Sequence, residues 1–204
     1  MTFVLFCLAG YLTGSVNTAL VLFRITGKQD PRERFSRNAG TTNVYRVMGP
    51  AWAGAVLLVD LGKAGLVSLA AGHWLPLNLV FWVGLFTLTG NRFPCFHRFR
   101  GGKGVAHFIG FCLVVSPMVT GFSLLGWCLA FWMSRQPFVG SLALTGILGL
   151  GLGFAPGMGL TGFTAIMACV VFIGLNHRRN ILEWKTGITH PPPRTPDKNK
   201  AGLP

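Results

Sequence analysis

The sequence predicts an all-α integral membrane protein with about seven transmembrane helices. Of its 204 residues, 51% are hydrophobic and only 11% are charged, against roughly 25% charged residues in an average soluble domain. A soluble fold of this length could not cover its surface with so few charges. Long stretches contain no Asp, Glu, Lys or Arg, which is the pattern of helices that cross a bilayer: 2–23, 64–91, 104–134 and 136–177.

Turn signals divide these stretches into helices. Ser116-Pro117 interrupts the third stretch, and Phe154-Ala155-Pro156-Gly157 interrupts the fourth. A helix needs about 20 residues to cross a membrane core of about 30 Å, so we expect the short helix at 105–115 to be re-entrant, half-buried or tilted. The predicted helices in order are 2–23, 50–72, 74–90, 105–115, 118–133, 138–155 and 158–175.

The basic residues predict the orientation. All but one of the 18 Lys and Arg residues fall in four segments, and the connections between those segments hold none: 24–49, 91–104, 134–137 and 176–204. Basic loops face the cytoplasm, so we expect the N-terminus outside and the C-terminus in the cytoplasm. An even number of helices would put basic loops on both sides. A cleaved signal peptide at 2–23 is the alternative, but that segment lacks the positive start such a peptide needs.

We therefore expect a single seven-span membrane domain over residues 1–188, with cytoplasmic loops at 24–49, 91–104, 134–137 and 176–188. Residues 189–204 are polar and Pro-rich, so we expect a disordered cytoplasmic tail. The five cysteines form no CxxC pair and are interpreted as small apolar residues. Asp60 and Lys63 lie three residues apart in the second span, which favours an ion pair over a proton relay.

Three cytoplasmic segments carry residues suited to binding phosphate. The first, 30–46, mixes small residues, hydroxyls and amides with arginines, so its turns can direct N–H groups at a phosphate. The second places three glycines around Lys103, directly before an apolar helix whose N-terminus adds N–H donors. Gly104 stands where a nucleotide-binding loop would have Ser or Thr. The third, 176–181, supplies a histidine and asparagines. Taken alone, the first segment is more typical of a basic loop at a membrane surface than of a phosphate site. The second favours phosphate binding over a flexible connector, and the third fits a basic membrane anchor equally well.

Together these segments resemble a known family. The pattern consists of Asp30-Pro31-Arg32, Ser36-x-Asn38-x-Gly40-x-Thr42-Asn43-Val44-x-Arg46, Asp60-x-x-Lys63, Phe99-Arg100-Gly101-Gly102-Lys103-Gly104-Val105-Ala106 and His177-Arg178-x-Asn180-Ile181. It resembles the bacterial acyl-phosphate:glycerol-3-phosphate acyltransferases (PlsY type) over nearly the whole chain, up to about Gly187. The resemblance implies a multi-pass enzyme of the bacterial inner membrane, with its active site facing the cytoplasm.

The activity implied by the resemblance is one step of phospholipid synthesis. A fatty acyl group moves from acyl phosphate to the 1-hydroxyl of glycerol 3-phosphate, giving lysophosphatidic acid and phosphate. Membrane lipid surrounds such an enzyme, and no metal, cofactor or nucleic acid is implied. Acyl phosphate is already activated, so the protein mainly has to hold two anions and orient one hydroxyl. We expect direct transfer, with the proton taken by a substrate phosphate or by His177.

The predicted site consists of the residues that match the family pattern. The expected catalytic residues are Ser36, Arg46, Lys103 and His177. The expected substrate-binding residues are Asn38, Gly40, Thr42, Asn43, Gly101, Gly102, Gly104 and Asn180.

Two other functions stay open on the sequence. A small-anion transporter would use the same basic loops, but it would need polar residues through the depth of several spans, and the third, sixth and seventh spans hold few beyond Ser and Thr. A catalytically weakened homologue with a scaffolding role would account for three departures from the usual family residues. These are Asn91 in place of His, Gly140 in place of Ser and Thr189 in place of an acidic residue.

Overall fold

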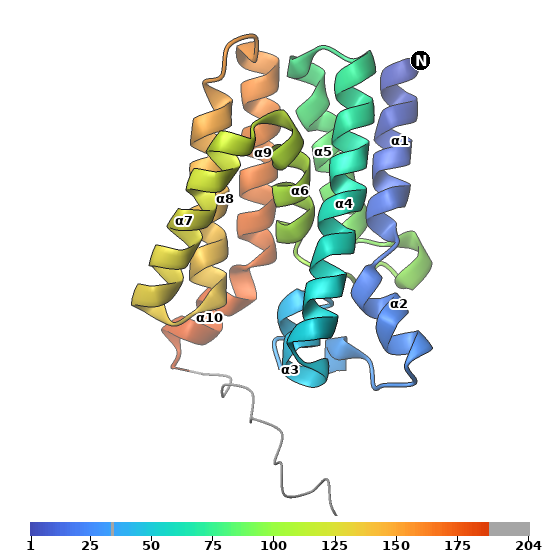
Figure 1. Cartoon of the computed structure of the whole chain (residues 1–204), viewed down its shortest axis with the longest axis vertical. Helices are drawn as coiled ribbons and strands as arrows, with labels where there is room; N and C mark the ends of the chain where they lie inside the picture. The colour runs from blue at the N-terminus through green and yellow to red at the C-terminus, as the bar shows by residue number, and fades with distance from the viewer. Residues whose placement is uncertain (34, 188–204) are drawn as a thin grey trace, which may run out of the picture.

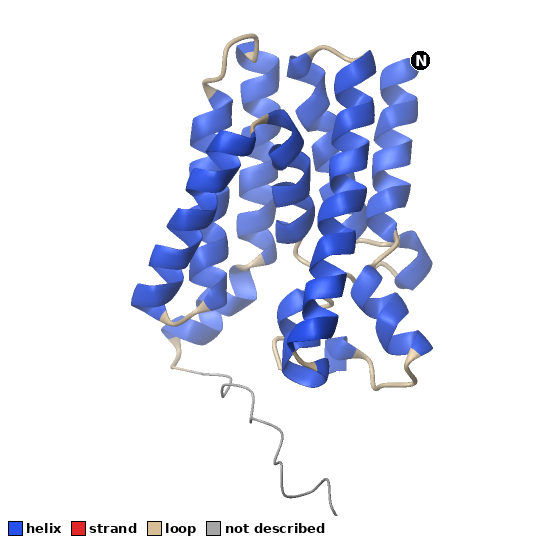
Figure 2. Ribbon diagram, in the orientation of Figure 1, coloured by secondary structure: helices blue, strands red, loops and turns tan. Residues whose placement is uncertain are grey.

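The computed structural model of the chain describes residues 1–33 and 35–187, and all regular elements in these ranges are helices (Figures 1 and 2). The longer helices stand side by side as a bundle, and α2, α3 and α10 gather at one end of it (Figure 1). The elements in order are α1 (Thr2–Ser15), α2 (Thr18–Ile25), η1 (Pro31–Glu33), α3 (Thr41–Met48), α4 (Pro50–Trp74), α5 (Leu77–Arg92), η2 (Cys95–His97), α6 (Val105–Val115), α7 (Pro117–Ser134), α8 (Pro137–Gly153), α9 (Gly159–Asn176) and α10 (Arg178–Lys185).

The predicted class, an all-helical membrane protein, is confirmed. Among the described residues, four segments are long and apolar enough to cross a bilayer: Thr2–Ile25, Pro50–Trp74, Pro117–Ser134 and Gly159–Asn176. Two apolar helices are shorter, at Val105–Val115 and Pro137–Gly153. At 1.5 Å per residue, α6 extends only about 16 Å, roughly half of a membrane core. The number of spans and the sides of the termini remain predictions.

The division of the third apolar stretch at Ser116-Pro117 is confirmed. The Ser116 hydroxyl accepts a hydrogen bond from the Val119 backbone N–H at 3.4 Å and caps α7. Pro117 occupies the first turn of α7, where its missing N–H costs nothing. The predicted short helix at 105–115 is therefore a separate element, α6, that ends where the cap begins.

The first predicted span differs from the structure, because residues 2–23 do not form one continuous helix. The chain breaks at Val16 and Asn17, and the Asn17 side chain starts α2 by accepting a hydrogen bond from the Leu20 N–H at 3.0 Å. The break leaves the carbonyl of Val16 outside the helical ladder, and the Lys63 ammonium donates a hydrogen bond to it.

The segments 24–49 and 176–188, expected as loops, contain the helices α3 and α10. The reason for α3 is tertiary: Val44 is fully buried in a small apolar cluster with Phe23 and Val56, which lie on α2 and α4. Burial of the face that carries Val44 stabilises α3. The short sequence of α3 is polar, so the sequence alone does not predict a helix there.

The predicted ion pair between Asp60 and Lys63 is confirmed, with 2.8 Å between Lys63 Nζ and Asp60 Oδ1. The Thr18 hydroxyl also donates to Asp60 Oδ1, at 2.6 Å. The pair therefore joins α4 to the break between α1 and α2. A charge pair within an apolar helix costs desolvation, so these additional bonds matter for its stability.

Small residues let neighbouring helices approach closely. A Cβ atom at Gly14 on α1 would lie 2.1 Å from the carbonyl oxygen of Thr87, and one at Gly90 on α5 would lie 2.0 Å from that of Tyr11. The α1–α5 pair is thus held at a spacing that only glycine allows. This spacing fixes the end of α5, where the carbonyls of Asn91 and Arg92 accept hydrogen bonds from the backbone N–H groups of the glycine loop 101–104.

Candidate active site

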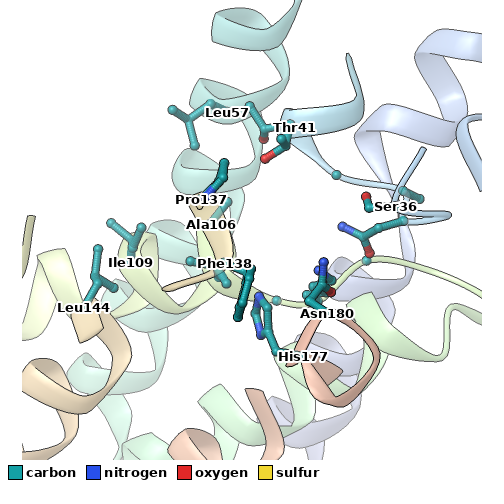
Figure 3. A pocket seen from close by; sticks show the side chains of 18 of the residues that line it. Ser36, Thr41, Leu57, Ala106, Ile109, Pro137, Phe138, Leu144, His177 and Asn180 are labelled. Carbon is teal, nitrogen blue, oxygen red and sulfur yellow. The ribbon is translucent and has the colours of Figure 1, made fainter. Parts of the chain in front are cut away.

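A cavity of about 390 Å³ opens between α3, α4, α6, α7, α8 and α10, a volume typical of small-molecule sites. Its polar side comes from the first loop, the glycine loop and the start of α10, as Figure 3 shows with Ser36, His177 and Asn180. Its apolar side is lined by Leu57, Ile109, Leu124, Trp127 and Leu144. The cavity therefore joins a cationic, hydrogen-bonding end to an end that suits a hydrocarbon.

Ten of the twelve predicted site residues line this cavity: Ser36, Asn38, Gly40, Thr42, Arg46, Gly102, Lys103, Gly104, His177 and Asn180. The fold thus brings together three segments that lie far apart in the sequence. Asn43 and Gly101 are not part of the lining.

Asn43 is buried and shapes the first loop from behind. Its Oδ1 accepts a hydrogen bond from the Ser36 hydroxyl at 3.0 Å, and its Nδ2 donates to the carbonyls of Pro31 at 3.1 Å and Asn38 at 2.9 Å. These bonds hold the turn in which Phe35 takes a left-handed conformation, with φ of +48°. Asn43 therefore contributes to the site indirectly, because it positions Ser36 at the cavity wall.

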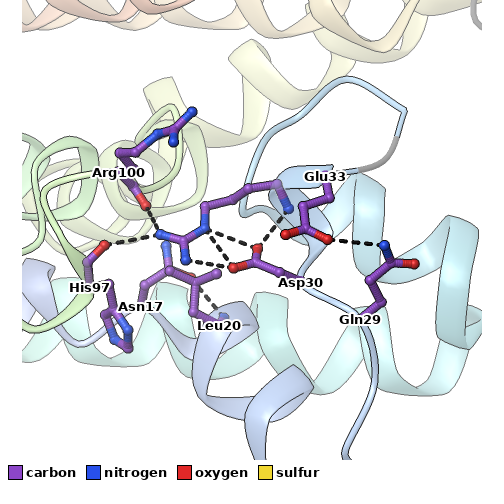
Figure 4. Close-up of polar contacts among 8 residues, drawn as sticks. Asn17, Leu20, Gln29, Asp30, Glu33, His97 and Arg100 are labelled. Atoms are coloured by element: carbon purple, nitrogen blue, oxygen red, sulfur yellow. Dashed lines mark hydrogen bonds and ion pairs between the residues drawn. The ribbon is translucent and has the colours of Figure 1, made fainter.

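A second cluster ties the first loop to the segment before the glycine loop (Figure 4). The Arg32 guanidinium pairs with the Asp30 carboxylate at 2.5 Å and donates to the carbonyls of His97 at 3.0 Å and Arg100 at 2.7 Å. Burial acts to raise the pKa of Asp30, but the bonds and charge of Arg32 prevail and lower it. The pair therefore stays ionised at neutral pH and fixes the two loops relative to each other.

Asn17 and Asn91 connect three parts of the site. Asn17 Nδ2 lies 3.2 Å from the carbonyl oxygen of Ala39 and 3.3 Å from Asn91 Oδ1, and both asparagines are buried. The backbone carbonyl of Asn91 accepts a hydrogen bond from the Gly102 N–H at 2.9 Å. The helix break at Asn17 therefore supports both the first segment, 30–46, and the glycine loop. The sequence did not predict this role, because the contacts join residues that lie far apart in the chain.

The glycines of the second loop pack against protein. A Cβ atom at Gly101 would lie 2.0 Å from the carbonyl oxygen of Asn91, and one at Gly102 would lie 2.8 Å from the Asn91 side chain and 2.9 Å from the carbonyl oxygen of Ala39. Any larger residue would push the loop off the end of α5. Their smallness therefore holds Lys103 in place at the cavity.

Lys103 is the cation at the centre of the polar end. Its Nζ lies 2.5 Å from Asn180 Oδ1, and the Asn176 side chain donates to its backbone carbonyl at 3.3 Å. Burial lowers the pKa of Lys103 to about 8; the Glu183 carboxylate opposes this, while Arg46, Arg92 and Arg179 add to it. A half-buried ammonium with one neutral partner is well suited to pair with a phosphate.

His177 lies at the junction of α9 and α10 and is buried. Its Nδ1 lies 2.8 Å from the carbonyl oxygen of Ile173, and since a carbonyl only accepts, Nδ1 carries the proton. Burial and then the nearby charge of Lys103 lower the pKa of His177 to about 4, against a smaller effect of the Ile173 carbonyl. At neutral pH the imidazole is therefore uncharged, and Nε2 is its hydrogen-bond acceptor.

Arg46 extends from α3 to the cavity and lies over the Phe35 ring, with 5.5 Å between Cζ and the ring centroid. Its Nη1 atom is buried and has no hydrogen-bond partner among the described residues. A buried guanidinium N–H without a partner is costly, and an anion in the cavity would satisfy it.

Several lining residues were not predicted. His107, on the first turn of α6, is almost fully buried, and its Nε2 lies 3.9 Å from Asp60 Oδ1, too far for a hydrogen bond. Glu183 lines the cavity from α10, and its carboxylate pairs with Arg179 at 2.6 Å. Trp127 lines it from α7. These residues lie within apolar or amphipathic helices, where sequence alone does not show which side chains reach a cavity.

The family model described as Glycerol-3-phosphate acyltransferase matches residues 4–187. A glycerol-3-phosphate acyltransferase of Pseudomonas fluorescens is 40% identical over 145 residues, which cover 70% of this chain and 76% of that protein. The Pseudomonas aeruginosa protein of the same name is 35% identical over 185 residues, covering 90% of this chain and 96% of its own length.

Two crystal structures of PlsY (YgiH), an integral membrane glycerol 3-phosphate acyltransferase, share this fold. The glycerol 3-phosphate form aligns with a TM-score of 0.87 at 30% identity, covering 93% of this chain and 95% of that one. The lysophosphatidic acid form aligns with a TM-score of 0.84 at 29% identity over the same shares of both chains. With a family match over nearly the whole described chain and relatives of similar length, the protein belongs to the glycerol-3-phosphate acyltransferase family.

Proposed function

We propose that this protein transfers a fatty acyl group from acyl phosphate to the 1-hydroxyl of glycerol 3-phosphate, giving lysophosphatidic acid and inorganic phosphate. The observation that carries the proposal is the two-part cavity. Lys103 and Arg46 supply positive charge at one end, and Ile109, Leu124 and Leu144 supply an apolar wall at the other. One substrate of this reaction is a small dianion, and the other joins a phosphate to a hydrocarbon chain.

The reaction needs orientation more than activation. The oxygen of the glycerol hydroxyl attacks the acyl carbon, the bond from that carbon to the phosphate oxygen breaks, and the electron pair leaves on phosphate. The hydroxyl proton passes to the departing phosphate or to Nε2 of neutral His177, which can accept it. Lys103 and Arg46 stabilise the negative charge that grows on the leaving group.

The remaining polar residues of the cavity position the two substrates. Ser36, held by Asn43, contacts phosphate together with Asn38, Gly40 and Thr42. Gly102 and Gly104 present the loop that carries Lys103, and Gly101 packs this loop against α5. Asn180, the partner of Lys103, forms a hydrogen bond with glycerol 3-phosphate, for which its side-chain amide can act as donor or acceptor.

We place the enzyme in the bacterial inner membrane as a single seven-span domain over 1–188, with the polar end of the cavity facing the cytoplasm. The basic segments support this orientation, since residues of all four segments line the cavity. The predicted tail 189–204, which includes Thr189, lies outside the described residues.

The test is product formation by purified protein in detergent or lipid. We expect lysophosphatidic acid from acyl phosphate and glycerol 3-phosphate, and none when acyl-coenzyme A replaces acyl phosphate. Glycerol 3-phosphate binding without product would instead indicate the catalytically weakened homologue. Uptake of phosphate into sealed vesicles without product would indicate the transporter.

A further inference from the structure

The apolar end of the cavity is lined by side chains from several of the apolar helices. Leu124 on α7 lines the cavity and is 43% exposed. Leu57 on α4 and Ile109 on α6 line the same space from other helices (Figure 3). These side chains give a hydrocarbon chain an apolar surface to lie against next to the polar end of the cavity.

Trp127 lines the same cavity from α7. It follows Leu124 by about one turn of α7, and it stacks on Phe131 with 5.1 Å between ring centroids and 20° between ring planes. The stack stabilises the indole orientation. Trp127 therefore forms a rigid aromatic part of the cavity wall.

The seat of the indole ring exists because residue 140 is glycine. A Cβ atom at Gly140 on α8 would lie 2.9 Å from Trp127 Nε1, 3.0 Å from Trp127 Cδ1 and 3.0 Å from the Trp127 carbonyl oxygen. A side chain there would turn the ring toward the cavity or separate α7 from α8. The neighbouring Ser141 does not fill this position, since its hydroxyl donates to the Pro137 carbonyl of its own helix at 3.0 Å.

We infer that Trp127, seated on Gly140, determines which acyl groups the enzyme accepts by limiting the width of the cavity next to the acyl carbonyl. This inference rests on the proposed function. It predicts a preference for unbranched chains, because a methyl branch near the carbonyl would meet the indole ring. In apolar enzyme pockets one such carbon group changes specificity by about 10- to 200-fold.

The experiment compares two acyl phosphates of equal length, one straight and one with a methyl branch near the carbonyl. Trp127→Ala should raise the ratio of kcat/KM for the branched over the straight chain by about tenfold or more. Trp132→Ala is the matched control, since Trp132 lies on the same helix and is 66% exposed. Equal ratios in the Trp127→Ala and Trp132→Ala variants would overturn the inference.

The Gly140→Ala substitution on α8 tests the contact between residue 140 and the Trp127 indole. It should slow transfer of both chains, whereas Gly146→Ala on the same helix should not, because a Cβ atom at Gly146 meets nothing within 4 Å. If Trp127→Ala does not fold, Trp127→Phe decides the question, and an unchanged branched-to-straight ratio in it contradicts the inference.

Binding of straight and branched lysophosphatidic acids to the purified protein gives a readout that needs no turnover. Absence of product in the wild type would contradict the proposed reaction, while the binding preference of Trp127→Ala would still support or overturn the role of Trp127. We expect the variant to lose the wild-type preference for the straight chain. Retention of that preference would exclude Trp127 as the determinant.

Discussion

Raising the pH from 7 to 9 should weaken the binding of glycerol 3-phosphate about tenfold, because Lys103 loses its charge. Burial lowers the pKa of Lys103 to about 8. A lysine is cationic below its pKa, so about nine-tenths of the molecules carry the charge at pH 7 and about one-tenth at pH 9. Only the ammonium form makes a charge-assisted bond to phosphate. His177 does not titrate in this range, since its pKa is about 4.

The assay is the KM for glycerol 3-phosphate measured from pH 6.5 to 9.5. Lys103→Arg should bind with little change across this range, because a guanidinium remains charged throughout. Lys28→Arg is the matched control at an exposed position and should keep the wild-type rise in KM. A flat wild-type profile, or an equal rise in Lys103→Arg, would refute the assignment of Lys103 as the phosphate-binding cation.

Three further predictions concern the site, the packing and the topology. Arg46→Ala should reduce kcat/KM about ten- to hundredfold while the protein still folds, because one charge-assisted contact is lost. Steady-state kinetics measures this change, and a kcat/KM close to that of the wild type would exclude Arg46 from the site. Gly14→Ala should lower the unfolding free energy by about 1–3 kcal/mol, since its Cβ atom would meet the Thr87 carbonyl. Gly54→Ala, whose Cβ atom meets nothing within 4 Å, should not, and equal melting temperatures for the two variants would contradict the packing argument. Reporter fusions at Arg98 should be cytoplasmic and those at Leu75 external, and the reverse result would overturn the proposed orientation.

Hydrophobicity and turn chemistry predicted most of the fold. Charge-free stretches located most of the apolar helices, although α4 contains Asp60 and Lys63, and Ser116-Pro117 located the boundary between α6 and α7. The break at Asn17 was missed, because the residue caps α2 while binding Ala39 and Asn91, which are distant in the sequence. Apolar patterning alone could not reveal contacts of that kind.

The residues that line the cavity could be predicted to a similar degree, and for related reasons. Motif residues such as Lys103 line the cavity as expected. Asn43 does not, because its hydrogen bonds are used within the loop, and Gly101 does not, because it packs on the end of α5. Motifs identify residues that a site requires, but they do not separate those that face the substrate from those that support the loops.

The measurement that tests the central claim most directly is the formation of lysophosphatidic acid from acyl phosphate and glycerol 3-phosphate by the purified protein. It is run beside Lys103→Ala, with thermal unfolding measured for both proteins. The proposed reaction predicts that the wild type forms lysophosphatidic acid and an equal amount of inorganic phosphate. It also predicts that the rate of product formation falls about tenfold or more in a folded Lys103→Ala variant. Wild-type protein that binds glycerol 3-phosphate yet forms no product, or a Lys103→Ala variant of undiminished activity, would contradict it.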